Sequence, residues 1–255
     1  DNNKLFAFLE TYSEKYNRVE FIENDPIQIP HRFHVKEDIE IAGFLTASIS
    51  WGQRPVILRN ANRLMELMDF EPYDFVRNCS ERDLKVFEGF KHRTFQTVDL
   101  RFFLKSLKHI YLDKGGLEKV FQDHFETDAR EALVQFNKIF NAIPHQKRSE
   151  KHISNPLKNS AAKRLNMFLR WMVRKDNAGV DFGLWSQLSP AKLMLPLDVH
   201  TGRIGRELGL LNRAQNDWKA VEEITQSLRR FNKEDPVKYD FALFGFGVNK
   251  NIDDF

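Results

Sequence analysis

The chain has a single cysteine, Cys79, among its 255 residues. A disulfide within the chain is therefore impossible, and cysteine-ligated zinc sites and iron–sulfur clusters are excluded because each needs several thiolates. No run approaches the roughly 18 apolar residues of a membrane-spanning helix, and the first residues, DNNKLFAFLETY, lack a signal-peptide pattern. We therefore expect a cytoplasmic protein with no membrane partner and no iron–sulfur cluster.

The sequence also lacks the P-loop, the dinucleotide fingerprint and the serine elbow. Its net charge is only +3, so a surface for nucleic acid would have to be a local basic patch. His31 and His34 could form a metal pair, but no carboxylate or cysteine accompanies them at ligand spacing. We therefore expect neither a metal nor another cofactor.

Helical periodicity is what the chain has in abundance. Hydrophobic residues make up 42% of it, and its 23 phenylalanines suit a core of bulky side chains between helices. No strand alternation, internal repeat or low-complexity tract is present, so we expect an all-α fold. We expect helices at about residues 4–16, 36–49, 55–68, 72–79, 81–87, 98–113, 117–125, 129–140, 160–174, 199–208 and 218–231 and from 236 onward, with a polar loop over 143–159.

The segment LMLPLDVHTGRIGRELGLL, residues 193–211, predicts a short helix that begins at a carboxylate. Asp198 suits the N-cap position and Gly209 the C-cap. His200 and Arg203 follow within the helix. The carboxylate is explained by an ordinary helix cap, or by an acid that stabilises positive charge on a sugar beside a phosphate.

Residues 160–174 predict an amphipathic helix, with Lys163, Asn166, Arg170 and Arg174 opposite its apolar face. If this helix begins at residue 160, Lys163 lies in its first turn. Free N–H groups there bind anions, and the helix dipole disfavours a protonated amine. A neutral amine could attack a sugar C1′, although the same pattern also describes a solvated basic face.

A lysine that opens one helix, followed by PLDVHxxRIxxxLGL opening another, resembles the helix–hairpin–helix DNA glycosylase superfamily. Residues 40–68 resemble its early helix pair, residues 89–121 its later helix beside DNA, and residues 239–248 a further family helix. The PLDV region is most similar to the archaeal 8-oxoguanine glycosylases. Over essentially the whole chain, PHRF, SAxKRLNxFLRWMVR and DPVKYDFALF resemble a conserved, uncharacterised bacterial family.

The resemblance implies a two-lobed helical fold with a cleft between the lobes. We expect residues 36–177 to form a central lobe that contains Lys163, and residues 1–35 with 178–255 to form a second lobe that contains Asp198. The implied activity is base excision from double-stranded DNA, in which an N-glycosidic bond is cut on an extruded damaged base. Schiff-base lyase activity at the abasic sugar is left open.

In that interpretation Lys163 and Asp198 are the catalytic pair. Lys163 would add to C1′, and Asp198 would stabilise the oxocarbenium-like sugar or take a proton from the amine. The other predicted residues would contact DNA or stack on the base. The DNA-binding set is Gln53, Arg54, His92, Arg93, Lys158, Arg164, Arg170, His200 and Arg203, and the base-stacking set is Trp51 and Trp185.

Two departures from the superfamily keep other functions open. The stretch PLKNSAAK, residues 156–163, has none of the glycines that let a hairpin backbone approach a phosphate. Lys163 and Asp198 lie 35 residues apart, further than in typical bacterial members. The missing glycines favour a non-catalytic nucleic-acid-binding protein that retains the scaffold. A protein or small-molecule interaction module is the third alternative.

Overall fold

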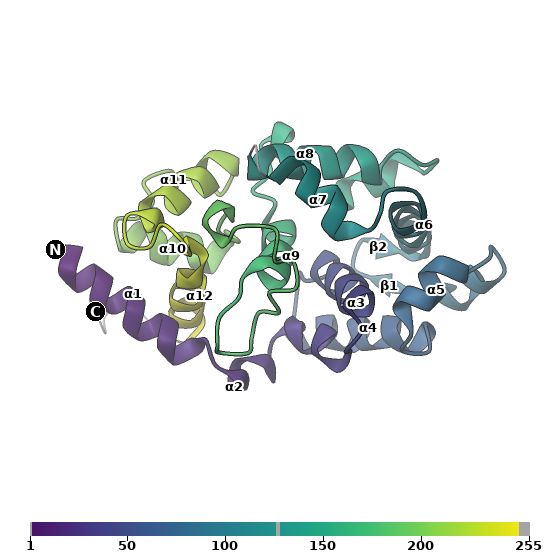
Figure 1. Ribbon diagram of the computed structural model, residues 1–255, viewed down its shortest axis with the longest axis horizontal. Helices are drawn as coiled ribbons and strands as arrows, with labels where there is room; N and C mark the ends of the chain where they lie inside the picture. The colour runs from purple at the N-terminus through teal and green to yellow at the C-terminus, as the bar shows by residue number, and fades with distance from the viewer. Residues whose placement is uncertain (1, 126–127, 250–255) are drawn as a thin grey trace. The chain divides into compact units, whose positions relative to one another are not determined.

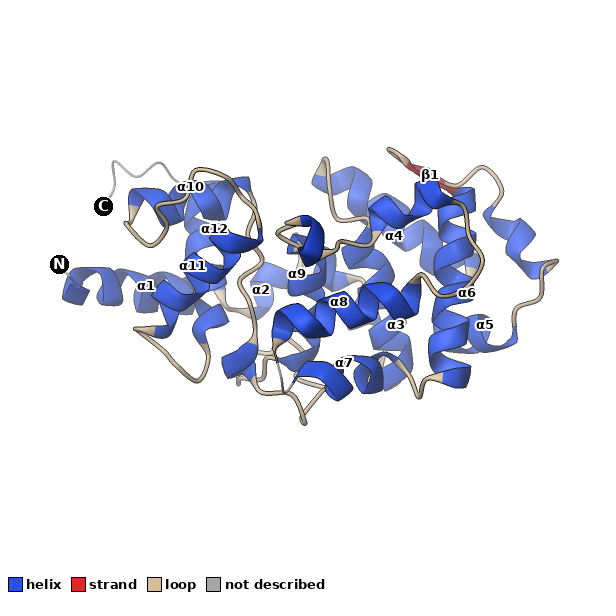
Figure 2. Cartoon of the chain, turned by 90° about the horizontal axis from the view of Figure 1, so that it is seen from above, coloured by secondary structure: helices blue, strands red, loops and turns tan. Residues whose placement is uncertain are grey.

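The computed structural model describes residues 2–125 and 128–249, which are mostly helical, as expected (Figures 1 and 2). The sequence did not predict any strand, and the structure has a short antiparallel hairpin of β1 (Lys91–His92) and β2 (Phe95–Gln96). Strands of two residues are too short to show an alternating pattern. The contacts divide the chain into two compact units: the first unit comprises residues up to 23 together with those from 156 onward, and the second unit comprises residues 24–155.

The first unit contains both predicted catalytic residues, which the expected lobes would have separated. Its helices are α1 (Asn2–Tyr16), α2 (Val19–Ile22), α9 (Lys163–Val173), α10 (Val199–Glu207), α11 (Trp218–Arg229) and α12 (Asp240–Asn249). Its 3₁₀ turns are Pro156–Lys158, Pro190–Lys192 and Pro236–Tyr239.

The helix α12 packs against α1 and α10 (Figure 1). The Phe246 ring meets Phe8 and Tyr12 of α1 edge to face, with ring centroids 5.1 and 5.0 Å apart. Gly245 lies on the same side, so close to the ring of Tyr16 that a side chain would overlap it. A small residue therefore allows α1 and α12 to approach closely at this point.

The second unit is built from α3 (Lys36–Ser48), α4 (Arg54–Leu67), α5 (Pro72–Asn78), α6 (Thr97–Asp113), α7 (Leu117–Phe125) and α8 (Ala129–Phe140). Its 3₁₀ turns are Pro26–Gln28, Pro30–Arg32, Asp83–Phe87 and Lys147–His152. The rings of Phe44, Phe103 and Phe140 meet at its centre, with centroids 4.9 to 6.0 Å apart. The expectation of a phenylalanine-rich helical core is confirmed.

Candidate functional site

The turn before α9 takes the place of the glycine-containing hairpin that the resemblance predicts. Asn159 and Ala162 have positive φ angles of 60° and 49°, in the left-handed region that glycine occupies most easily. Asparagine tolerates this region better than most residues, whereas alanine is strained there. The chain therefore makes a tight turn without glycine. Because Ala162 is left-handed, α9 begins at Lys163 and not at residue 160 as expected.

A carboxylate at the start of α11 holds this turn in place. Asn159 donates from Nδ2 to Asp217 Oδ2 at 2.9 Å, and Ser160 and Asp217 form an isolated antiparallel bridge. Asp217 also caps α11, since its Oδ1 accepts the Ala220 amide at 3.1 Å. A hydrogen bond from Arg213 holds the pKa of Asp217 well below its usual range, so the carboxylate stays charged.

Lys163 opens α9 with a half-buried side chain. Among the described residues, the polar contact of its amine is with Met167 Sδ, 3.8 Å away. The N-cap residue of α9 is Ala162, which has no side-chain group that could cap the helix. The amides at a helix start carry partial positive charge and attract anions. The amine therefore lies beside a region suited to an anionic group.

Asp198 is the N-cap of α10, as the sequence predicted. Its Oδ1 accepts the Thr201 amide at 2.9 Å, and Gly209 follows the helix with φ of 70°. The N-cap prediction is confirmed, and Gly209 takes the left-handed conformation of a helix-ending glycine one residue after the C-cap, Leu208. The carboxyl group is half-buried, and the described residues give its second oxygen no hydrogen bond. One oxygen thus holds the helix while the other remains available.

Asp240 is a buried carboxyl group that the sequence analysis did not identify, and its pKa is influenced by both predicted catalytic residues. Asp240, at the start of α12, is 4% exposed, and its Oδ2 accepts a hydrogen bond from Arg170 Nη1 at 2.6 Å. Burial raises the pKa of Asp240 to about 6, against the opposing effect of Arg170. The charges of Asp198 and Lys163 also act on this pKa, the first raising and the second lowering it. Both side chains therefore lie within electrostatic range of one buried carboxyl group.

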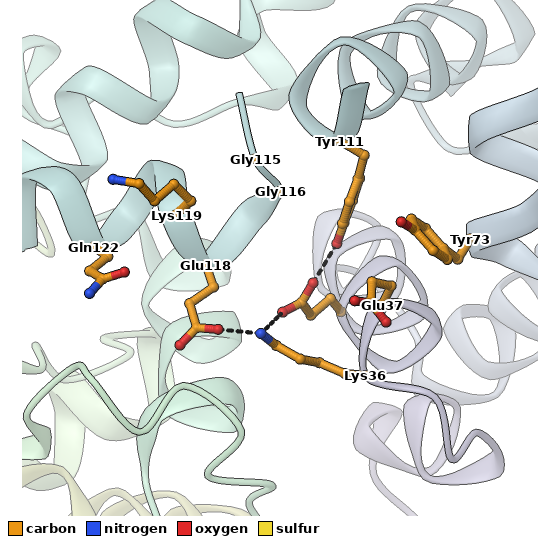
Figure 3. A pocket seen from close by; sticks show the side chains of 10 residues that line it. Lys36, Glu37, Tyr73, Tyr111, Gly115, Gly116, Glu118, Lys119 and Gln122 are labelled. Atoms are coloured by element: carbon orange, nitrogen blue, oxygen red, sulfur yellow. Dashed lines mark hydrogen bonds and ion pairs between the residues drawn. The ribbon is translucent and has the colours of Figure 1, made fainter. Parts of the chain in front are cut away.

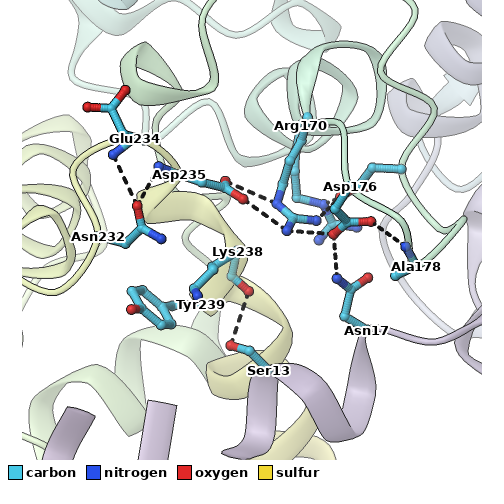
Figure 4. Close-up of polar contacts among 12 residues, drawn as sticks. Ser13, Asn17, Arg170, Asp176, Ala178, Asn232, Glu234, Asp235, Lys238 and Tyr239 are labelled. Atoms are coloured by element: carbon cyan, nitrogen blue, oxygen red, sulfur yellow. Dashed lines mark hydrogen bonds and ion pairs between the residues drawn. The ribbon is translucent and has the colours of Figure 1, made fainter. Parts of the chain in front are cut away.

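Arg170 and Arg174 form a buried ionic network with the aspartates around them. Arg170 Nε and Arg174 Nη1 bind the two oxygens of Asp181 at 3.1 and 3.0 Å. Arg174 also contacts Asp176 and Asp235, which Figure 4 shows converging on the network, at 2.7 and 3.0 Å. Burial by itself lowers the pKa of Arg174, but these carboxylates raise it overall.

This network changes the interpretation of the polar face of α9. Asn166, Arg170 and Arg174 are all buried, so the face is not a solvated basic surface. Arg170 was assigned to DNA, and its guanidinium is committed to Asp181 and Asp240 inside the unit. Its contact with DNA stays a prediction, and one that would require these ion pairs to open. The sequence did not reveal these ion pairs, because the partners lie up to 70 residues apart in the chain.

The other predicted residues of this unit differ in accessibility. His200 and Lys158 are exposed, whereas Arg203 is half-buried and donates to the Gly247 carbonyl at 3.2 Å. Burial lowers the pKa of Arg164 to about 10. Trp185 is 0% exposed and meets Phe168 edge to face, so a base could stack on it only if the local structure opened. The roles of these residues in binding DNA or the base stay predictions.

In the second unit, the predicted residues gather around the turn before α4. His92 is 1% exposed, and its two ring nitrogens contact Asn60 Nδ2 at 2.9 Å and the Trp51 carbonyl at 3.0 Å. These contacts make His92 a support for the turn. Arg93 and Gln53 are exposed, Arg54 and Trp51 are half-buried, and Arg93 packs beside Gly52. Trp51, Gln53, Arg54 and Arg93 remain predicted contacts.

The described residues contain neither a membrane-spanning helix nor a cluster of metal-binding side chains. None of their helices is both long and apolar enough to cross a membrane. Within the same residues, no cluster of three or more histidine, cysteine, aspartate or glutamate side chains is arranged to hold a metal ion.

The fold and the site define a mostly helical protein. In it, the charges of Lys163 at the start of α9 and of Asp198 at the start of α10 both influence the pKa of the buried Asp240. By sequence, the chain belongs to the family described as "Protein of unknown function (DUF2400)", which it matches over residues 25–249. No curated protein and no solved structure matches the chain. These comparisons give no link to the helix–hairpin–helix DNA glycosylases, so that resemblance stays a prediction from motifs.

Proposed function

We propose that this protein is a DNA glycosylase that acts on an extruded damaged base, with Lys163 and Asp198 as its catalytic residues. The observation that supports this proposal is the common electrostatic neighbourhood of Lys163, Asp198 and Asp240 within one unit. A nucleophilic amine, an acid with a free oxygen and a buried carboxyl group are the components that displacement at a sugar C1′ requires.

In the proposed reaction, the neutral amine of Lys163 forms a bond to C1′ as the glycosidic bond breaks. The electron pair of that bond leaves with the base, which takes up a proton. Asp198 stabilises the positive charge that develops on the sugar, and accepts a proton from the attached amine. Ring opening then gives a Schiff base, from which loss of a 2′ proton eliminates the 3′ phosphate.

The two helix termini support this assignment of roles. The start of α9, where the helix dipole is positive, suits a phosphate beside the attacked sugar. Asp240 is positioned by Arg170 within the same unit, and a carboxyl group with a pKa of about 6 can exchange a proton near neutral pH. Asp240 therefore acts on the charges of the pair without itself contacting the sugar.

Borohydride trapping on a duplex with one abasic site tests the lysine. The wild type should form a covalent adduct, which Lys163→Gln should abolish. Lys219→Gln is the matched control, because Lys219 is an exposed lysine on α11 of the same unit with no predicted role in binding, and the variant should leave the adduct unchanged. An adduct that survives in Lys163→Gln would rule out Lys163 as the nucleophile.

Asp198→Asn separates chemistry from helix capping, because asparagine caps helices about as well as aspartate. The variant should fold normally and release base about 10²- to 10⁴-fold more slowly, as loss of a charge-stabilising or proton-accepting group predicts. If the wild type neither forms an adduct nor releases any damaged base, the enzymatic proposal is wrong. Salt-dependent duplex binding without chemistry would then identify a non-catalytic nucleic-acid-binding protein.

A further inference from the structure

A pocket with a volume of about 220 Å³ lies in the unit of residues 24–155 (Figure 3). Its walls come from the first turn of α3, from α5, from the end of α6 and from α7. The loop between α6 and α7 contributes Gly116, whose φ of 98° excludes most other residues. A Cβ at Gly116 would lie 3.3 Å from Tyr111 Cε1, so glycine also leaves the Tyr111 ring undisturbed.

The floor of this pocket is a chain of polar contacts that begins at a buried hydroxyl group. Tyr111 donates to Glu40 Oε2 at 2.6 Å, and Glu40 is only 2% exposed. Burial and the charge of Glu40 raise the pKa of Tyr111 well above its usual value, so the hydroxyl keeps its proton and donates. Lys36 lies 3.7 Å from Glu40 and forms a second ion pair with Glu118. Its charge is thus neutralised by two carboxylates.

Glu37 supplies a third carboxylate to the same pocket. Its charge raises the pKa values of both Lys36 and Tyr111, which shows that it lies close to them. Among the described residues, no hydrogen bond or ion pair engages its side chain, which is half-buried beside Tyr73 (Figure 3). Glu37 lies in the first turn of α3, where the helix dipole favours a negative charge, and its carboxylate can pair with a cation that enters the pocket.

The charge of the lining favours a cation over an anion. Three glutamates and two lysines line the pocket, and the second lysine, Lys119, is paired with Asp123. The three glutamates outnumber the two lysines, so the lining has a net negative charge. The two tyrosine rings, with centroids 5.3 Å apart, add aromatic surface to the wall. Carboxylate and aromatic groups together are the usual partners of ammonium and guanidinium groups.

We propose that this pocket binds a small organic cation through a primary ammonium or guanidinium group, with Glu37 as its counter-charge. The pocket is smaller than the roughly 300–1,000 Å³ of typical ligand sites, so it fits a compact molecule. The aromatic wall formed by Tyr73 and Tyr111 suits an organic cation better than a metal ion. Tyr73 and Tyr111 pack against the carbon chain of the ligand, and Glu40 and Glu118 both pair with Lys36.

Calorimetric titration with agmatine, which carries both cationic groups, tests the assignment. We expect saturable binding of one agmatine per chain, which weakens as salt is added. Glu37→Gln should weaken it at least tenfold. Glu66→Gln is the matched control, because Glu66 is an exposed glutamate in an ordinary ion pair on α4 of the same unit, and it should change the affinity less than twofold.

Two further titrations determine whether the ligand is a cation and whether it is a small molecule or part of a protein. Inorganic phosphate should give no heat of binding, and a five-residue glycine peptide with a central arginine should bind more weakly than agmatine. Absence of agmatine binding at millimolar concentration, equal binding by Glu37→Gln, or binding of phosphate would each overturn the proposal. Tighter binding of the peptide would overturn the assignment to a small molecule, since it would identify the arginine of a protein partner.

Discussion

Replacing Arg174 by methionine should be among the most damaging single changes to the unit that contains Lys163. The Arg174 side chain is 3% exposed and contacts three carboxylates, those of Asp176, Asp181 and Asp235. Methionine fills similar volume but leaves these carboxylates without their shared cation. Breaking a buried ion pair from one side costs about 3–5 kcal/mol. For a chain of this size, such a loss lowers the melting temperature by roughly 6–20 °C.

The same variant should show an unusual dependence on pH. In the wild type, burial raises the pKa of Asp176, but Arg174 lowers it by more, so the pKa is lowered overall. Asp176 therefore stabilises the folded state above its unfolded pKa of 3.8, and this stabilisation is lost as the pH falls. In Arg174→Met that contribution is absent, and Asp235, whose pKa burial already raises, binds its proton still more readily. The folded variant takes up protons as the pH falls from 7 to 4. The difference in free energy of unfolding between the wild type and Arg174→Met should therefore become smaller over that range.

Urea denaturation followed by circular dichroism at pH 7 and pH 4 measures both effects. Arg174→Lys should recover part of the loss, because it keeps the charge but not the forked geometry. Arg63→Met is the control: Arg63 and Glu66 form an exposed pair, worth about 0.5 kcal/mol or less, and its removal should matter equally at both pH values. A penalty below about 1 kcal/mol for Arg174→Met, or one that grows as pH falls, would refute the reasoning.

Two backbone positions give predictions of opposite sign. Gly245→Ala should lower the free energy of unfolding by about 1–3 kcal/mol, because its Cβ would overlap the Tyr16 ring and lie 2.8 Å from Cε2. Gly247→Ala, with 3.1 Å to Ile204 Cγ1, should cost less, and equal melting temperatures for the two variants would contradict the argument. Asp69→Gly should raise the free energy of unfolding by about 0.5–1 kcal/mol, since Asp69 places a left-handed residue and a negative charge just after the C-terminus of α4. Chemical denaturation checks this gain, which a neutral or destabilised variant would disprove.

Much of the local structure was predictable because it depends on neighbours in the sequence. Asp198 was identified as a cap from its place before a periodic segment, and the hydrogen bond to Thr201 follows from that local geometry. The start of α9 was misplaced because Ala162 adopts a left-handed conformation that its type does not suggest. The turn before α9 is held by a hydrogen bond from Asn159 to Asp217. Asp217 lies 58 residues further along the chain, so the sequence of the turn does not predict this bond.

The candidate site was only half predictable for the same physical reason. Lys163 and Asp198 stood out as charged residues at helix starts, which sequence patterns reveal. Asp240 did not, because it opens a strongly apolar helix and its importance comes from burial and from Arg170. The pocket at Glu37 was missed altogether, since its lining comes from four helices and a loop whose proximity no local pattern encodes.

The buried ionic network holds in place both the helix that carries Lys163 and the start of the helix that carries Asp240. Arg170 lies two turns after Lys163 on α9 and binds both Asp181 and Asp240, so it ties the helix that carries the lysine to the start of α12. Arg174, one turn further along, binds the second oxygen of Asp181 and extends the connection to Asp235. A free surface lysine would need no such support, because a solvated amine functions in many orientations. Holding an amine near a buried carboxyl group requires fixed helices, since small displacements of a reacting group are costly to catalysis. Arg174→Lys should therefore preserve the fold better than it preserves adduct formation, a difference that trapping and denaturation of the same sample would measure together.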